Sequence, residues 1–303
     1  MKHAIDIIIP TYNNCEELQL CLKGFEQQSF NDFRIIVCVD GSTDNTIDYL
    51  QIFKGHSKVD LLVVHHADGL NHGRNATRNL ALPHLNSDFL LLCDSDAIPR
   101  SNFVQCHFDV LSIKECISVG DLEYSNANSN LWAAYLHTRG KRKYSPNDEV
   151  PFHYATTGNM GLKTEWFISL GGQDEAMRTY GGGDTEFAYR LRKQYNAPVI
   201  YNRSAIADST MTKTIEFALN QMEEFGRINL PYIRKKHPNF NEIYKVGLLD
   251  GTDVKSRLFR LLLNPLLGNI SHFFARILPI SIAIPFLAHA VGSKVLKGFT
   301  SSK

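Results

Sequence analysis

Short apolar runs alternate with amphipathic stretches through the first third of the chain. Period-2 and continuous apolar runs predict strands, whereas period-3.6 stretches predict helices. Strands are expected at residues 5–9, 34–39, 60–65 and 88–93. Helices are expected near residues 15–27, 44–53, 73–83 and 101–112. This β-α-β-α order predicts an α/β fold with a mostly parallel sheet and flanking helices, because parallel strands need long crossovers.

The pattern becomes less regular in the second third of the chain. From about 117 to 210, short strands mix with loops rich in Gly, Asn and Thr, a composition that suits a substrate-facing region. Residues 213–247 are predicted to be helical with polar faces. We therefore expect three regions, which cover residues 1–115, 116–212 and 213–303.

The last fifty residues differ from the rest in composition. After Asp253 the chain has no acidic residue, while basic residues continue among leucine, isoleucine and phenylalanine. Such basic, apolar helices are typical of segments that lie on an anionic membrane. Residues 277–293 carry no formal charge, but the stretch is short for a bilayer span, and Pro279 and Pro285 are expected to interrupt it. The interpretation is a membrane-associating tail at 255–303. The alternative is a pair of helices that pack on the domain or form a dimer contact.

Composition narrows the possible classes of protein. The 303 residues are 44% hydrophobic, which is enough to form the core of one large domain or two small ones. The net charge of +1 gives no overall electrostatic attraction for nucleic acid. The six cysteines show no C-x-x-C spacing, which argues against a zinc site or a disulfide framework and fits a reducing compartment. Residues 1–10 have a strand pattern and no signal-peptide core. We expect a cytoplasmic protein that does not bind nucleic acid.

Two carboxylates one residue apart follow the strand predicted at 88–93. Side chains alternate along a strand, so Asp94 and Asp96 should lean to the same side. Open α/β sheets bind ligands just past the carboxyl ends of their strands. Carboxylates there suit Mg²⁺ or Mn²⁺ that carries substrate phosphates. Alone, the pattern is more often a turn with solvated acids, so the metal interpretation depends on the neighbouring segments.

Two further segments end predicted strands of the same sheet. The first, residues 9–13, offers backbone groups and the ring of Tyr12 near a base, although alone it is a strand-to-helix turn. The second places Asp40 before the turn at 41–44, and a carboxylate there can accept the N–H of a pyrimidine base.

The fourth segment, residues 71–79, contains one glycine and two arginines. Gly73 lies near a predicted helix start, where backbone amides favour anions. Arg74 and Arg78 are one helical turn apart and could bind a diphosphate together. The alternative is a solvated basic face.

Together these four segments resemble the nucleotide-binding half of inverting glycosyltransferases of family two, which have the GT-A fold. The resemblance covers roughly residues 5–110 in order and spacing. It implies a Rossmann-like sheet, a UDP-sugar donor, and Mn²⁺ or Mg²⁺ bound by Asp96. Arg78 matches the Ala-Arg-Asn position of the family, with Thr77 in place of the usual alanine. The donor-binding residues that the resemblance implies are Pro10, Thr11, Tyr12, Asp40, Arg74, Arg78, Asp94 and Ser95.

The second half is similar to the galactosyltransferase-type C-terminal segment of the same family. There, Gly-Gly-Glu-Asp carries the base that takes a proton from the acceptor hydroxyl. Here Gly183 replaces the glutamate, and Asp184 aligns with the aspartate. Asp184 could also be a simple helix N-cap, but a cap does not need three preceding glycines, which are costly in entropy. The resemblance implies acceptor contacts at Asn159, Asp174, Glu175, Gly182 and Gly183.

One departure from the family concerns the metal. Family members commonly have a histidine ligand after the last small strand, and the matching position here is Asp208. A carboxylate is an equally suitable hard ligand, and the alternative is water as the third ligand.

The leading hypothesis is a metal-dependent inverting glycosyltransferase. It would move a hexose or N-acetylhexosamine from a UDP-sugar to a hydroxyl of a glycan or a polyprenyl-linked acceptor, at the inner face of the cell membrane. One alternative is a sugar-nucleotide nucleotidyltransferase, but residues 10–14 lack the glycine-rich loop of that class. Another is an inactive membrane-bound binding module, against which Asp94, Asp96 and Asp184 count. The sequence leaves the sugar, the acceptor and the oligomeric state open.

Overall fold

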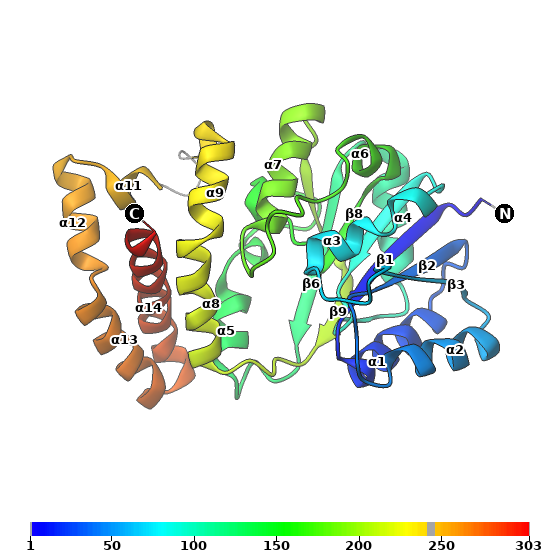
Figure 1. Ribbon diagram of the computed structural model, residues 1–303, viewed down its shortest axis with the longest axis horizontal. Helices are drawn as coiled ribbons and strands as arrows, with labels where there is room; N and C mark the ends of the chain where they lie inside the picture. Colours follow the sequence, from blue (N-terminus) through cyan, green and yellow to red (C-terminus); the bar gives the residue numbers. More distant parts are fainter. Residues whose placement is uncertain (1, 241–245, 303) are drawn as a thin grey trace. The chain divides into compact units, whose positions relative to one another are not determined.

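The computed structural model describes residues 2–240 and 246–302, which form two compact units (Figure 1). The first unit takes the described residues of 1–123, 140–178 and 183–210. The second takes those of 124–139, 179–182 and 211–303. The boundary expected near residue 115, between the nucleotide-binding and acceptor-binding halves of one domain, lies within the first unit. Residues 124–139 belong with the C-terminal helices, a grouping that the predicted ranges do not contain.

Four parallel strands form one half of the sheet in the first unit. They lie in the order β3-β2-β1-β4, and the register aligns Ile7 of β1 with Ile35 of β2 and Leu91 of β4. The strands are β1 (Ile5–Thr11), β2 (Phe33–Val39), β3 (Asp60–His65) and β4 (Phe89–Cys93). The helices that follow the first three are α1 (Cys15–Glu26), α2 (Thr46–His56) and α3 (Arg74–Asn79). The predicted β-α-β-α order is confirmed.

The other half of the sheet is antiparallel in the strand pairs β4–β8, β8–β6, β9–β5 and β9–β7. The described sheet has nine strands, in the order β3-β2-β1-β4-β8-β6-β9-β5, and β7 pairs with β9. The added strands are β5 (Ile98–Pro99), β6 (Ile117–Tyr124), β7 (Glu149–Val150), β8 (Asn159–Lys163) and β9 (Val199–Ser209). The parallel arrangement thus holds for the first four strands, whose crossovers are helical, and it ends at β4.

Side chains of the central strands alternate between two apolar cores. Ile7 and Ile9 of β1 pack with α1, α2 and α4 (Phe103–Ile113) on one face of the sheet. Ile8 packs on the other face with α6 (Thr164–Ser169) and α7 (Gly183–Tyr195). Figure 1 shows α1 and α2 on the opposite side of the strands from α6 and α7. Short 3₁₀ turns of the described chain lie at Leu82–His84, Lys141–Lys143, Phe152–Tyr154 and Pro238–Phe240.

The second unit is helical, and its core joins α5 to the C-terminal helices. Trp132 of α5, Leu219 of α8 and Leu287 of α14 belong to the same buried cluster. The described helices are α5 (Leu131–Thr138), α8 (Ile215–Arg227), α9 (Asn229–Lys236), α11 (Gly247–Asp250), α12 (Val254–Leu262), α13 (Pro265–Ile277) and α14 (Ile280–Ser301). Helix was expected over 213–247. This is confirmed for α8 and α9, and the part of the prediction on 241–245 lies outside the described residues.

One expectation about the tail was wrong. Pro285 does not interrupt the apolar stretch, because α14 begins after Pro279 and continues through Pro285 as a single helix. Proline removes one backbone hydrogen bond from a helix and crowds the carbonyl four residues earlier. Here the helix around Pro285 buries Ala283 and Leu287, and this packing offsets the loss.

Candidate functional site

The loops that follow β1, β2 and β4 are tied to one another by side-chain hydrogen bonds. The Thr11 hydroxyl donates to Asn14 Oδ1 (2.5 Å), and Asn14 Nδ2 donates to Ser95 Oγ (2.6 Å). Asn13 Oδ1 accepts from the backbone N–H of Thr43 (2.7 Å). The structure therefore brings the predicted donor-binding segments together at the carboxyl ends of the parallel strands.

Pro10 and Tyr12 lie beside this junction in different environments. Pro10 is buried within β1. Tyr12 is 50% exposed at the end of the strand, so its ring is open to a ligand. An exposed ring past a strand end is the feature that stacking on a nucleotide base requires.

Asp40 is buried and fixes the start of α3. Its carboxylate accepts the backbone N–H groups of His72 (2.7 Å) and Gly73 (3.1 Å). Gly73 has a φ of +87°, the left-handed conformation that glycine adopts without strain. His66 Nε2 lies 3.5 Å from Asp40 Oδ1, and burial together with the neighbouring His72 lowers the pKa of His66. The proposed contact of Asp40 with a base stays a prediction.

The two arginines of α3 have different surroundings. Arg78 is 2% exposed, and its Nη2 donates to Asp94 Oδ1 (2.5 Å) while its Nη1 donates to Gln173 Oε1 (3.2 Å). Nε of Arg78 and Nε2 of Gln173 are buried and have no hydrogen-bond partner within the described chain. Arg74, by contrast, is exposed. Arg78 therefore positions Asp94, while a phosphate contact of either arginine remains a prediction.

One face of α3 also holds the loop at 171–175. Asn79 Oδ1 accepts from the backbone N–H of Gln173 (2.8 Å), and its Nδ2 donates to Gln173 O (2.8 Å) and Glu175 Oε1 (2.9 Å). Asn75 Nδ2 donates to Asp174 O (2.8 Å). The sequence analysis did not single out Asn75, Asn79 or Gln173. The sequence feature that indicates Asn75 and Asn79 is the i, i+3, i+4 spacing of polar residues 75, 78 and 79, which places them on one face of the helix.

Gly172 explains why this loop is rich in glycine. It has a φ of +75°, and a Cβ there would overlap the side chain of Asn79. The predicted acceptor residues Asp174 and Glu175 thus lie on a loop that α3 holds in place.

The candidate base and the donor-side carboxylate lie on either side of residues 157–158. The backbone N–H of Asp94 faces Gly158 O (3.4 Å), and a Cβ on Gly158 would lie 2.8 Å from Asp94 Oδ2. The Thr157 hydroxyl donates to Asp184 Oδ1 (2.7 Å). Asp94 and Asp184 therefore each contact one of two consecutive residues, Gly158 and Thr157.

The glycines before Asp184 have distinct roles. Gly182 has a φ of +84°, which an L side chain rarely adopts. Gly183 is the first residue of α7, and a Cβ there would lie 3.2 Å from Asn75 Nδ2. These conformations place Asp184 in the first turn of α7.

Asn159, expected to contact the acceptor, is fully buried. Its Nδ2 donates to Asp121 O and Ala205 O (both 2.9 Å), and its Oδ1 faces His107 Nε2 (2.8 Å). Since every polar group of this amide is engaged inside the protein, we assign it a structural role. Burial lowers the pKa of His107 to about 4, so its ring is neutral at pH 7, with Nε2 donating to Asn159 Oδ1.

The residues predicted to bind metal lie near the same edge of the sheet. Asp96 is exposed just past β4, and Asp208 pairs in register with Ile98. The Asp208 carboxylate accepts two hydrogen bonds from Arg100, one from Nε (2.9 Å) and one from Nη2 (2.7 Å). Across residues 2–240 and 246–302, no group of three or more His, Cys, Asp or Glu side chains is placed to hold a metal. Mg²⁺ commonly binds through one or two carboxylates with water and substrate phosphates, so Asp96 fits such a site. Asp208 would first have to leave Arg100.

Comparison with known proteins identifies the family. The family model described as Glycosyl transferase family 2 matches residues 6–171, more than half of the chain. Chondroitin synthase of Escherichia coli is 24% identical over 227 residues, which are 63% of this chain and 32% of that protein. The chain therefore spans about a third of this relative. The E. coli protein named UDP-Glc:alpha-D-GlcNAc-diphosphoundecaprenol beta-1,3-glucosyltransferase WfgD is 29% identical over 129 residues, 42% of this chain and 49% of its own.

Solved structures share the fold. S. aureus TarS 1-349 in complex with UDP superposes with a TM-score of 0.56 at 17% identity, over 100% of this chain and 90% of that one. The mannosyltransferase PcManGT from Pyrobaculum calidifontis, in complex with GDP-Man and Mn²⁺, gives a TM-score of 0.61 at 14% identity, over 98% and 87%. The GT-A fold and the resemblance to family two are confirmed: the chain belongs to glycosyl transferase family 2.

Proposed function

We propose that the protein is an inverting glycosyltransferase that moves a hexose or N-acetylhexosamine from a UDP-sugar to a hydroxyl of a glycan or lipid-linked glycan. The observation that carries the proposal is the pairing at residues 157–158. Gly158 contacts the donor-side Asp94, and Thr157 holds the candidate base Asp184. A donor bound at the strand ends would present its anomeric carbon close to that base.

The donor side is formed by the strand-end loops. Tyr12 offers an exposed ring and Asp40 a buried acceptor close to the junction of β1 and β2. TarS was solved with UDP and with UDP-GlcNAc, and the name of WfgD specifies UDP-Glc, which support a uridine donor. PcManGT was solved with GDP-Man, so the base of the nucleotide is a discriminating measurement.

Asp184 is the group proposed to take the proton. As the acceptor oxygen attacks the anomeric carbon, its proton passes to the Asp184 carboxylate. The bond between that carbon and the diphosphate oxygen breaks, and its electron pair leaves with UDP. The bond from Thr157 fixes the orientation of the carboxylate during this step.

A divalent ion, Mn²⁺ or Mg²⁺, would neutralise the leaving diphosphate. Asp96 is the residue proposed to hold it, with Asp208 as a second ligand once its pair with Arg100 opens. The Mn²⁺ of the PcManGT complex supports a metal in this fold.

The acceptor is proposed to be a glycan or a polyprenyl-linked glycan at the cytoplasmic face of the membrane. The names of two relatives, chondroitin synthase and a glucosyltransferase acting on a diphosphoundecaprenol, support this class. The tail at 255–303 is basic and has no acidic residue, a composition that suits an enzyme acting at an anionic membrane surface.

A donor panel tests the proposal. Purified protein is incubated with UDP- and GDP-sugars, candidate acceptors, and Mn²⁺, Mg²⁺ or excess chelator, and the released nucleotide is quantified. Acceptor-dependent release of UDP that stops with chelator supports metal-dependent transfer. Release of pyrophosphate would instead identify a nucleotidyltransferase, and release without an acceptor would identify donor hydrolysis.

A further inference from the structure

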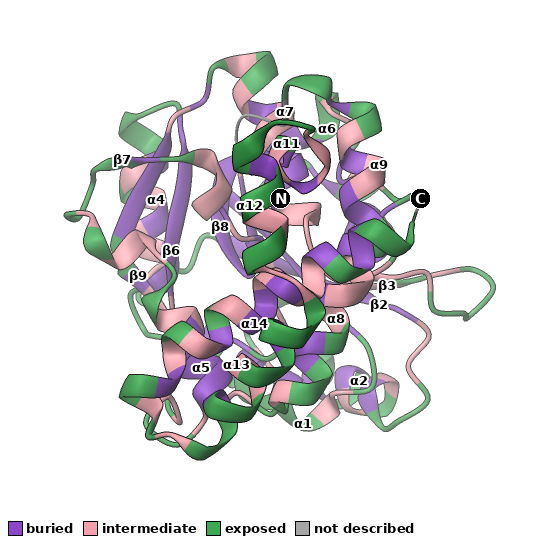
Figure 2. Ribbon diagram, turned by 90° about the vertical axis from the view of Figure 1, so that its left-hand side faces the viewer, coloured by how far each residue is buried: buried purple, intermediate pink, exposed green. Residues whose placement is uncertain are grey.

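Helices α12 and α13 expose a continuous row of large apolar side chains. Of these, Val254, Leu261 and Leu266 are 80%, 64% and 69% exposed. Figure 2 shows much of both helices as exposed ribbon. The other exposed members, each at least a third accessible, are Leu258, Leu262, Leu267, Ile270, Phe273, Phe274 and Ile277. Large exposed apolar patches on soluble proteins commonly mark sites that bind a protein or a membrane.

The row lies on one side of each helix. At about 100° per residue, positions 254, 258, 261 and 262 fall within an arc of about 100° on α12, and positions 266, 270, 273, 274 and 277 do so on α13. Both helices have their own N-caps, because Asp253 accepts from the Ser256 N–H (3.1 Å) and Asn264 from the Leu267 N–H (3.1 Å). Each of these two capped helices thus has an exposed apolar side, and we call the two sides together the α12–α13 face.

Basic side chains border this face. On the same helical wheel, exposed Lys255 and Arg257 lie on opposite sides of the α12 row. Exposed Arg276 lies beside the α13 row, with its Nε 3.6 Å from Glu216 Oε1 of α8. The last acidic residue, Asp253, is held at the helix cap, and no acid follows it in the sequence. An apolar row bordered by Lys and Arg suits the interfacial layer of a bilayer. There the apolar side chains and the aliphatic parts of Lys and Arg lie in the lipid, while the charged groups reach the lipid phosphates.

Helix α14 is differently placed, although it is the one described helix long and apolar enough to cross a membrane by length and composition. Its apolar part, residues 280–293, would span only about 21 Å at 1.5 Å per residue, short of a hydrocarbon core of about 30 Å. Beyond it, Lys294 and Lys297 pair with Glu223 of α8 at 2.8 and 2.7 Å. A Cβ on Gly298 would overlap the backbone of α8 at Glu223.

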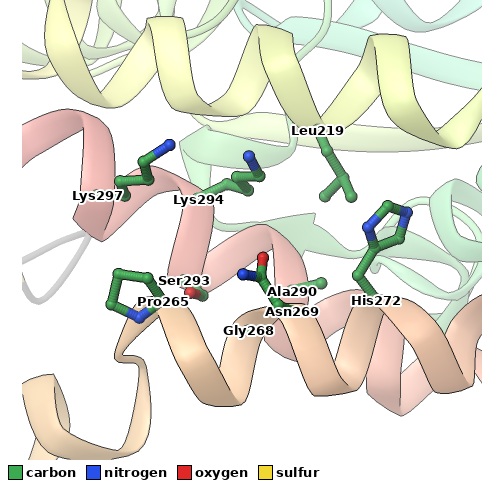
Figure 3. A pocket seen from close by; sticks show the side chains of 9 residues that line it. All are labelled: Leu219, Pro265, Gly268, Asn269, His272, Ala290, Ser293, Lys294 and Lys297. Atoms are coloured by element: carbon green, nitrogen blue, oxygen red, sulfur yellow. The ribbon is translucent and has the colours of Figure 1, made fainter.

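The underside of α13 faces protein as well. A cavity of about 60 Å³ lies between α8, α13 and α14, and Figure 3 shows Asn269 and His272 of α13 opposite Lys294 and Lys297. A Cβ on Gly268 would overlap Ser293. One side of α13 is thus closely packed and partly polar, and its apolar residues are on the other.

We infer that the α12–α13 face docks flat on an anionic lipid bilayer, with α14 remaining inside the helical unit as its packing support rather than spanning the membrane. The attachment is peripheral: the apolar row enters the interfacial layer and the bordering cations contact lipid phosphates. The inference does not depend on the proposed catalytic activity, because it rests on exposure and charge alone.

Co-sedimentation with vesicles tests the inference. The full chain is expected to pellet with 3:1 phosphatidylcholine:phosphatidylglycerol vesicles at 100 mM salt. Leu261→Asp combined with Phe273→Asp should weaken binding at least tenfold, because charges would enter the apolar layer. The matched control, Ile113→Asp with Ile52→Asp, adds the same charge at positions 86% and 61% exposed in the first unit and should bind as the parent does. Unchanged melting temperatures confirm that both variants fold.

A second variant separates charge from apolar burial. Lys255→Gln with Arg257→Gln should lower binding to anionic vesicles about 30-fold and barely change binding to pure phosphatidylcholine. Equal binding of this variant and the parent would overturn the anionic part of the inference. Absence of pelleting by the parent, or a dimer in sedimentation velocity that Leu261→Asp dissociates, would overturn the membrane assignment. Retention in cell membranes after alkaline carbonate washing would show a spanning helix and overturn the role given to α14.

Discussion

Replacement of Asp184 by asparagine gives the most direct test of the proposed chemistry. Asparagine keeps the shape of the side chain, and its Oδ1 can still accept the hydrogen bond that Thr157 now donates to Asp184 (2.7 Å). The second carboxylate oxygen becomes an amide nitrogen, which cannot take a proton. The variant should therefore fold normally and place its side chain as the parent does.

The magnitude follows from the loss of general-base catalysis. A positioned base contributes at least about 10²-fold to the rate, equivalent to about 2.7 kcal/mol of transition-state stabilisation. Thr157→Val is the matched control, since it keeps the base and removes only the bond that orients it. Loss of one such hydrogen bond is worth about 1–1.5 kcal/mol, so the rate should fall only about tenfold.

The assay is acceptor-dependent UDP release, run beside calorimetric titration of UDP. We expect kcat to fall at least 10²-fold in Asp184→Asn, with the Kd for UDP unchanged within twofold. If UDP binding collapses while turnover stays near that of the parent, Asp184 is a structural cap of α7. Glu175 would then become the candidate base, because Glu186 is fully buried and pairs with Arg190 (2.9 Å).

Three further changes have defined outcomes. Asp96→Ala should remove the Mn²⁺-dependent part of UDP binding by calorimetry, and identical Mn²⁺ enhancement in variant and parent would exclude it as a ligand. Gly158→Ala would place a Cβ 2.8 Å from Asp94 Oδ2, so Asp94 must shift from Arg78. We expect the Kd for UDP to rise at least tenfold. An unchanged Kd would contradict a donor role for Asp94. Burial lowers the pKa of His107 from 6.5 to about 4, so the unfolded state binds a proton at this residue before the folded state does as pH falls. The contribution of His107 to the free energy of unfolding is therefore complete above pH 6.5. It decreases by about 3 kcal/mol as pH falls to 4. Urea unfolding from pH 7 to 4 should show this loss in the parent and a smaller one in His107→Gln, and equal slopes would show that the buried ring is not its source.

The elements of the first unit could be predicted because their patterns are strong and local. The run at 88–93 became β4, buried along most of its length, and Gly73 ended a loop where α3 begins. A strand whose two faces are both covered by helices must be apolar at nearly every position, which a sequence displays directly. The order of the strand-end motifs then indicated the family, and the family match confirmed it.

Side-chain partners were not predictable in the same way. Asn159 follows a glycine in a motif that resembles an acceptor site, yet the fold places its amide in a buried network with His107. Arg78 and Arg74 share a helix, but only Arg78 is buried against Asp94. A polar residue in a glycine-rich segment has the same local signal whether it binds a ligand or another part of the protein.

The sequence by itself determined the β-α-β-α order, the carboxylates at the end of β4, the glycines before Asp184 and the acid-free tail, because propensity and periodicity act over a few residues. Only the tertiary structure decided what joins these parts. Residues 157–158 lie more than sixty positions after Asp94 in the chain, and they meet it because β8 pairs antiparallel with β4. Likewise, α12, α13 and α14 all carry large apolar residues in sequence, and packing against α8 buries one side of α14 while leaving the α12–α13 face exposed. Local sequence specifies which surfaces are apolar, whereas long-range contacts decide which of them are covered.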